Sequence, residues 1–204
     1  MNQLVSDATR RHMTVDQYLA FEQQSPARHE YLAGEVFAMT GASAQHHAIA
    51  TRLFAATVSH LRGSMWQAHL SEVKVRVRTN MRDYFYYPDM LVISDQERRA
   101  DGGDRAPFVR SPRLITEVIS PSTENIDRRE KMMMYREITS LEEYVLVAQD
   151  TCEVTVFRRR QNWRPMVCNE LPDLVELRSI GLSLPLGHLY RDAPKTVSRV
   201  AEPK

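Results

Sequence analysis

Cysteine is scarce in this chain, which has only Cys152 and Cys168 among its 204 residues. The two thiols stand apart and form no Cys-x-x-Cys pair, which argues against a zinc site of the finger type. Isolated thiols are typical of proteins in a reducing compartment, so we expect a cytoplasmic protein.

Long apolar runs are also missing. No stretch is long and apolar enough to cross a membrane, and the first residues, MNQLVSDATRRHM, lack the apolar core of a secretory signal. The formal net charge of +1 does not by itself indicate a nucleic-acid partner. A local basic patch remains open, because the cations are unevenly spread along the chain.

The composition is that of an ordinary globular protein, with 43% hydrophobic and 26% charged residues. The length allows one domain with a substantial core and does not require two. We expect a loose arm over residues 1–12, a single domain over 13–190 and a loose polar tail over 191–204.

Capping patterns predict two helices in the first third of the chain. Thr14, with Gln17 three residues later, is a capping box, and Ser43 can cap a helix over residues 44–62. Between these helices, residues 30–39 predict a strand or a tight hairpin.

The middle of the chain predicts strands. Residues 72–78 alternate apolar and charged side chains, which is typical of a half-exposed strand. The outer face of that strand would carry Lys74, Arg76 and Arg78. A second strand is predicted over 84–93. A third, over 113–119, is nearly continuous in apolar character and should be buried on both faces.

The remaining pattern predicts a loop over 95–107, a helix from Asp127 to Ile138, and a possible hairpin of strands 144–148 and 154–157. Short strands and turns follow over 163–189. The order helix, three strands, helix, strand predicts a mixed α/β or α+β domain.

Glu117 and Asp89 break the strand patterns. A carboxylate at Glu117, inside a buried strand, is costly unless it is paired or binds a metal; a core ion pair is the alternative. Asp89 follows Pro88, and proline in a strand indicates an edge or a bulge, where active sites often lie. The alternative there is a solvated aspartate at a strand entry.

Lys131 lies on the apolar face of its predicted helix. With Met134, Tyr135 and Ile138 it follows the i, i+3, i+4, i+7 spacing of one helix face, so it should point toward the core or a cleft. The alternatives are an i,i+4 pair with Asp127 or an amine that reaches out to water.

Together these three residues suggest a reaction. Two carboxylates from neighbouring strands can hold Mg²⁺ through oxygen, and Mn²⁺ is a second candidate. A nearby lysine can orient the attacking water or stabilise charge on a phosphate. The metal would polarise the phosphoryl oxygen, so the set suits phosphodiester hydrolysis.

The residues around these positions resemble the Uma-two-type family of restriction endonucleases, in the PD-(D/E)XK nuclease superfamily. The resemblance is carried by Pro88-Asp89, Glu117-Val-Ile-Ser120, Ser122-Thr123, Asp127-Arg128-x-x-Lys131 and Tyr135. It extends to Glu30-Tyr-Leu-x-Gly-Glu35, His47 and Tyr144-Val-Leu-Val, and covers about residues 13–190.

The resemblance implies a restriction-endonuclease-like αβββαβ core with a mixed central sheet and extra β-strands. The helix over 44–62 would be its first element, with Asp89 on the second core strand and Glu117 on the third. The superfamily places its lysine two residues after the glutamate, where this chain has Ile119. In the Uma-two-type pattern the lysine stands on the following helix, as Lys131 does.

The resemblance also implies a metal-dependent endonuclease acting on nucleic acid, with DNA expected, Asp89 and Glu117 as metal ligands and Lys131 as the third catalytic residue. From their positions in the chain, Glu35 and His47 are accessory candidates, and Glu72 is a weaker one. The alternatives are solvated glutamates and a structural histidine. Asp127 is expected to cap its helix and steady Lys131.

Several alternatives stay open. The basic segments around Arg76 and over 158–160 could grip a phosphate backbone, although solvated strand faces explain them more simply. The fold could serve a catalytically inactive binding module, and the substrate could be RNA or branched DNA. A homodimer is a hypothesis from fold analogy, since two sites would be needed to cut both strands together.

Overall fold

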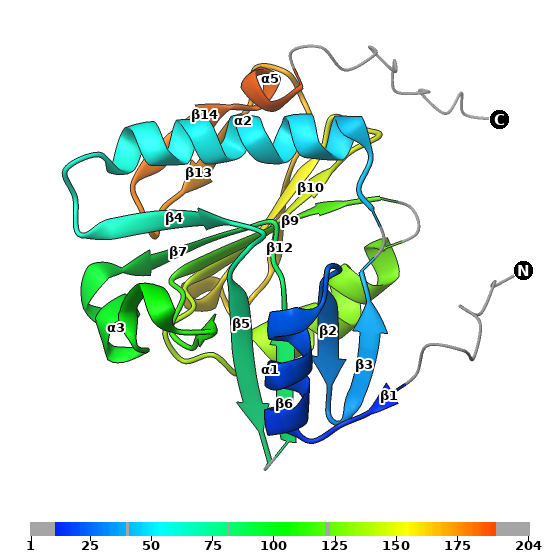
Figure 1. Cartoon of the computed structure of the whole chain (residues 1–204). Helices are drawn as coiled ribbons and strands as arrows, with labels where there is room; N and C mark the ends of the chain where they lie inside the picture. Colours follow the sequence, from blue (N-terminus) through cyan, green and yellow to red (C-terminus); the bar gives the residue numbers. More distant parts are fainter. Residues whose placement is uncertain (1–10, 40, 81, 121–122, 191–204) are drawn as a thin grey trace, which may run out of the picture.

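The computed structural model describes residues 11–39, 41–80, 82–120 and 123–190 (Figure 1). The described residues form two six-stranded sheets and one two-stranded sheet. Residues 1–10 of the expected arm, the expected tail from residue 191, and Ser122 of the motif lie outside the described residues.

One six-stranded sheet, here the core sheet, carries the expected αβββαβ order. In spatial order its strands are β12 (Pro165–Cys168), β11 (Val154–Arg158), β10 (Glu143–Ala148), β9 (Leu114–Ile119), β7 (Met90–Ser94) and β4 (Trp66–Leu70). The first core helix is α2 (Ala44–Leu61), which Ser43 caps as predicted. Strand β9 is parallel to β10 and antiparallel to β7, so the sheet is mixed and the predicted fold class is confirmed.

The other six-stranded sheet, here the second sheet, is formed by the three N-terminal strands, the two strands inserted between β4 and β7, and one short strand that follows β7. In spatial order its strands are β1 (Arg11–His12), β3 (Glu35–Ala38), β2 (His29–Leu32), β6 (Arg82–Tyr86), β5 (Lys74–Thr79) and β8 (Phe108–Val109). Helix α1 (Val15–Gln24) begins at the predicted Thr14 capping box and packs Tyr18 against Tyr31 and Phe85 of this sheet. The backbone of residues 11–12, expected in the loose arm, pairs with β3 instead.

The predicted strand over 84–93 is wrong as a single element. It divides into β6 and β7, which enter different sheets, and residues 87–89 lie between them. Pro88 has no amide hydrogen to donate to a neighbouring strand. The chain therefore leaves the second sheet at this point and enters the core sheet at β7.

The predicted loop over 95–107 contains helix α3 (Asp95–Ala100) and the 3-10 turn η2 (Gly103–Arg105). Ser94 and Glu97 form a capping box at the start of α3. The prediction of a loop rested on the mixed charges and glycines of this segment and overlooked this pattern. The hairpin of β10 and β11 is confirmed. The last described elements are the 3-10 turn η4 (Arg159–Gln161), β13 (Leu174–Leu177), β14 (Leu182–Pro185) and α5 (Leu186–Leu189).

The predicted helix that begins at Asp127 takes a different form. It consists of a π-helical turn, η3 (Ile126–Lys131), followed by α4 (Met132–Tyr135). Asp127 is not its cap, because the Asp127 amide already donates to the Thr123 carbonyl at 3.0 Å. Isolated π-helical turns occur often at functional sites.

Strand alternation decides which side of the core sheet each residue faces. On β9, Leu114 and Val118 join the core beneath α2, whereas Ile115 and Ile119 join the core around Tyr135. Glu117 has the same parity as Ile115 and Ile119, so its side chain faces α4. This second core also contains side chains of β5 and β6, so α4 packs between the two sheets.

No helix in the described part of the chain is long and apolar enough to cross a membrane.

Candidate active site

Glu117 is buried, with 4% of its surface exposed, and its carboxylate is fully engaged. Lys131 Nζ lies 3.2 Å from Oε1, and the Tyr135 hydroxyl donates to the same oxygen at 3.0 Å. The backbone amide of Asp89 donates to Oε2 at 3.3 Å. The sequence therefore predicted the burial of this carboxylate, and the structure supplies its partners.

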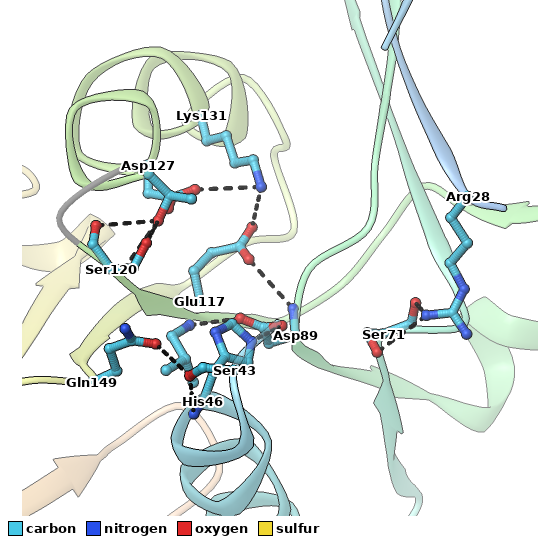
Figure 2. A network of polar contacts seen from close by, with 12 residues as sticks. Arg28, Ser43, His46, Ser71, Asp89, Glu117, Ser120, Asp127, Lys131 and Gln149 are labelled. Carbon is cyan, nitrogen blue, oxygen red and sulfur yellow. Dashed lines mark hydrogen bonds and ion pairs between the residues drawn. The ribbon is translucent and has the colours of Figure 1, made fainter. Parts of the chain in front are cut away.

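Asp89 lies at the bend just before β7, rather than inside the second core strand as expected. Its Oδ2 accepts a hydrogen bond from the Val118 amide at 2.7 Å, next to Glu117 on β9. Its Oδ1 lies 2.8 Å from His46 Nε2, on the first turn of α2 (Figure 2). These contacts hold the two carboxylates side by side between β7 and β9.

Lys131 is surrounded by three carboxylates from three separate elements. Its Nζ lies 3.2 Å from Glu30 Oε1 on β2, 3.2 Å from Glu117 Oε1 on β9, and 3.3 Å from Asp127 Oδ1 in the same π-helical turn. The ring of Tyr86 lies 5.8 Å from this ammonium group. The expected pair with Asp127 exists, but it is buried and forms part of a larger cluster.

The electrostatics of the cluster follow from burial and an excess of negative charge. Burial raises the pKa of Glu117 well above its usual range, and the carboxylates of Asp127, Asp89 and Glu30 add to that rise against the opposing effect of Lys131. Burial disfavours the Lys131 cation, but Glu117, Glu30 and Asp127 outweigh burial and raise the pKa of Lys131 well above its usual range. Lys131 is thus held as a cation with three carboxyl groups around its ammonium group.

Two of the accessory candidates lie apart from this cluster. Glu35 is exposed at the start of β3, and His47 is exposed on α2. Glu72 is an exposed turn residue that pairs with Arg28 at 3.3 Å.

Two residues close to these candidates in the sequence lie in the cluster instead. Glu30 precedes Glu35 in the same hairpin, and His46 is adjacent to His47 on α2. The capping signal at Ser43 places His46 in the first turn of α2, where its amide donates to Ser43 Oγ at 3.0 Å. Adjacent helix residues differ by about 100° in direction, which separates His46 from His47. Only the position of Asp89 shows which of the two histidines faces the site.

The basic segments are largely occupied by structural contacts. Lys74 is buried and donates to the Tyr87 hydroxyl at 3.1 Å, so the prediction that it lies on an outer face is wrong. Arg76 pairs with Asp83 at 2.7 Å, and the buried Arg158 pairs with Glu143 at 2.7 Å. Lys74 and Arg158 are therefore buried rather than solvated, and their contacts leave neither of them free to grip a phosphate backbone.

The donor chemistry of Asp89 and Glu117 fits a hard divalent cation, because carboxylate oxygens are the ligands such ions prefer. Within the described ranges, no three histidine, cysteine or acidic side chains are grouped so as to hold a metal ion among them. Mg²⁺ is commonly bound by one or two carboxylates and keeps several waters, which is compatible with this pair.

Comparisons with known proteins identify the family. The Uma2 family model, described as "Putative restriction endonuclease", matches residues 15–187. The chain belongs to the Uma2 family. Two uncharacterised Synechocystis proteins are similar to it. One is 32% identical over 180 residues, which cover 88% of this chain and 92% of the relative. The other is 30% identical over 142 residues, which cover 70% and 78%.

A solved structure shows the same fold. The crystal structure of a protein from Anabaena variabilis, described as a "putative nuclease", matches this Uma2 chain with a TM-score of 0.73 and 20% identity. The match covers 88% of this chain and 98% of the other. At that identity the likeness establishes the fold alone.

In this Uma2 protein the position two residues after Glu117 is Ile119, which is buried in the core around Tyr135. The ammonium group beside Glu117 belongs to Lys131 on the π-helical turn, whose Nζ lies 3.2 Å from Glu117 Oε1. The family resemblance inferred from the motif is confirmed.

Proposed function

We propose that this protein is a metal-dependent endonuclease that hydrolyses phosphodiester bonds in nucleic acid, with DNA as the substrate. The observation that carries the proposal is the convergence of Asp89, Glu117 and Lys131 at one place, from a bend, a strand and a helix. The descriptions of the Uma2 family and of the Anabaena protein support it.

Asp89 and Glu117 would hold the cation, with Mg²⁺ expected and Mn²⁺ as a substitute. When bound, the metal would polarise a phosphoryl oxygen and lower the pKa of a bound water. Lys131 brings a fixed positive charge to the site, which would offset the charge that develops on the phosphate. His46 would orient Asp89 through their 2.8 Å contact.

The number of carboxyl groups in the cluster, four beside the single ammonium group of Lys131, supports a cation-binding role. Burial raises the pKa of Glu117, and repulsion from Asp127, Asp89 and Glu30 adds to that rise. A divalent ion beside Asp89 and Glu117 would act against both causes. Metal binding would then release a proton wherever Glu117 is still protonated.

A homodimer and a cytoplasmic location belong to the proposal as well. Two copies would place two sites on one duplex, as cleavage of both strands requires. Sedimentation of the purified protein with and without duplex DNA would report the oligomeric state.

The test of the proposal is cleavage of plasmid and linear DNA with Mg²⁺, with Mn²⁺, and with a chelator. Wild type should cut only with metal, and Asp89→Asn and Glu117→Gln should reduce cutting to background. Glu72→Gln is the matched control, because the Glu72 side chain is 81% exposed in a turn and its ion pair is with the part-exposed Arg28.

Cleavage that survives Glu117→Gln would overturn the site. If wild type binds DNA without cutting it under any metal condition, the binding-module alternative would replace the nuclease. RNA and branched DNA, run in the same assay, decide the substrate class.

A further inference from the structure

Glu30 reaches the proposed catalytic centre from the second sheet. The convergence of Asp89, Glu117 and Lys131 does not by itself require a residue from that sheet. We propose that Glu30 is a positioning residue of the nuclease reaction, which fixes Lys131 and the turn that carries Asp89. The inference rests on the proposed function and adds a further acidic residue to its site.

The fold aims Glu30 at the site through strand alternation. Its neighbour Tyr31 is buried beneath α1, where its ring contacts Tyr18 and Phe85. Alternate side chains of a strand point to opposite faces, so Glu30 points away from α1 and toward the helix that carries Lys131.

The start of β2 is fixed by a second buried carboxylate. Glu22 of α1 accepts a hydrogen bond from the His29 amide at 2.9 Å, and its other oxygen lies 3.0 Å from His29 Nδ1. The Tyr87 hydroxyl donates to Glu22 at 2.8 Å. Glu30 therefore extends from a strand end that is tied to both α1 and the turn after β6.

A single oxygen of Glu30 joins two parts of the site. Oε1 lies 3.2 Å from Lys131 Nζ and accepts a hydrogen bond from the Tyr87 amide at 3.4 Å. Tyr87 begins the turn Tyr87-Pro88-Asp89, which delivers Asp89 to the core sheet. Glu30 thus fixes the distance between the proposed catalytic cation and the turn of a proposed metal ligand.

The Lys131 ammonium has three N–H donors, and the structure offers three carboxylates at 3.2–3.3 Å. Glu117 is also held by Tyr135, and Asp127 lies one turn away in the same helical segment. Glu30 is the partner that comes from the other sheet. Without its charge, Lys131 would be held by Glu117 and Asp127 alone and could turn away from the Asp89 side.

The experiment compares Glu30→Gln with Glu35→Gln in metal-dependent DNA cleavage. Both substitutions remove one carboxylate from the same hairpin, but Glu35 is exposed on β3. We expect Glu30→Gln to lower kcat by about 10- to 100-fold with little change in KM, as loss of a supporting hydrogen bond does at other metal sites. Glu35→Gln should stay within about twofold of wild type, as surface substitutions usually do.

Measuring the effect of Glu30→Gln on kcat in a Lys131→Met protein distinguishes positioning of Lys131 from a general structural role. If Glu30 acts through Lys131, then Glu30→Gln should cost no further kcat once Lys131 is absent. A structural effect would lower activity by the same factor in both backgrounds. The proposal would be overturned if Glu30→Gln lowered kcat by the same factor with and without Lys131. It would also be overturned if the Glu30→Gln variant had the kcat of wild type.

Two measurements without turnover complete the design. Calorimetric Mg²⁺ titration should give a similar affinity for Glu30→Gln and wild type, whereas Glu117→Gln should weaken binding. Equal weakening in both variants would make Glu30 a ligand and overturn the positioning role. In urea unfolding, the effects of Glu30→Gln and Lys131→Met on the free energy of unfolding should not add in the double variant, because the two residues are in contact. Additive effects would overturn the contact itself.

A wild-type chain that cuts nothing would instead overturn the proposed function, and the catalytic role of Glu30 with it.

Discussion

His46 Nε2 lies 2.8 Å from Asp89 Oδ1, while the adjacent His47 is exposed to solvent. The rings of the two histidines stand edge to face, with 5.8 Å between their centroids. The two residues have the same chemistry and neighbouring positions, so they form an internal pair of test and control.

We predict that His46→Ala lowers metal-dependent cleavage by about 10- to 100-fold, because Asp89 loses the residue that orients it. His47→Ala should leave cleavage within about twofold, as an exposed substitution usually does. Initial rates at saturating metal check both variants. Similar losses in the two would show that α2 matters only for folding or for substrate contact.

Tyr135→Phe should destabilise the protein, because the Tyr135 hydroxyl is one of the donors to the buried Glu117 carboxylate. An intramolecular hydrogen bond contributes about 0.5–1.5 kcal/mol, so we expect a loss of that size in the free energy of unfolding. Urea unfolding at neutral pH measures it. Tyr84→Phe, on the partly buried Tyr84 of β6, is the matched control and should change stability by less than about 0.5 kcal/mol.

Glu143→Gln should cost more stability than Glu142→Gln. Glu143 is buried and accepts hydrogen bonds from the guanidinium of the buried Arg158 at 2.7 Å and from the Ser179 amide at 2.8 Å. Removing its charge leaves the buried Arg158 without its carboxylate partner, and breaking a buried ion pair in this way costs about 3–5 kcal/mol. Glu142 forms a half-exposed pair with Arg113, and such pairs contribute about 0–1 kcal/mol. Similar losses in the two variants would contradict this account.

The stability contribution of Lys74 should depend on pH. Burial lowers the pKa of Lys74 from its ordinary value of 10.5, against the opposing effect of the Glu22 carboxylate. Between the lowered folded pKa and 10.5, the unfolded chain binds more protons than the folded protein, so stability from this group rises with pH.

Urea unfolding of wild type and Lys74→Met at pH 7 and pH 10 measures this effect. The free energy of unfolding of wild type should increase relative to that of Lys74→Met between the two pH values. An equal difference at both would show that Lys74 has the same pKa in the folded and unfolded states.

Local patterns along the chain predicted most of the secondary structure. Capping at Thr14 and Ser43 set the starts of α1 and α2, and the apolar run over 113–119 predicted a strand buried on both faces. These predictions succeed because caps and strand periodicity depend on residues that are close in sequence. The same patterns predicted the buried position of Glu117 and the inward direction of Lys131.

The tertiary structure decided which polar residues meet. Glu30 and Lys131 lie in opposite halves of the sequence, and no local pattern relates a residue of β2 to one of a later helix. The direction of His46 likewise depends on where the turn after Pro88 delivers Asp89. Side chains converge according to sheet order and packing between layers. The sequence by itself therefore determined most of the elements and the buried positions of Glu117 and Lys131, and only the folded arrangement joined these two residues with Asp89, Glu30 and His46 in one site.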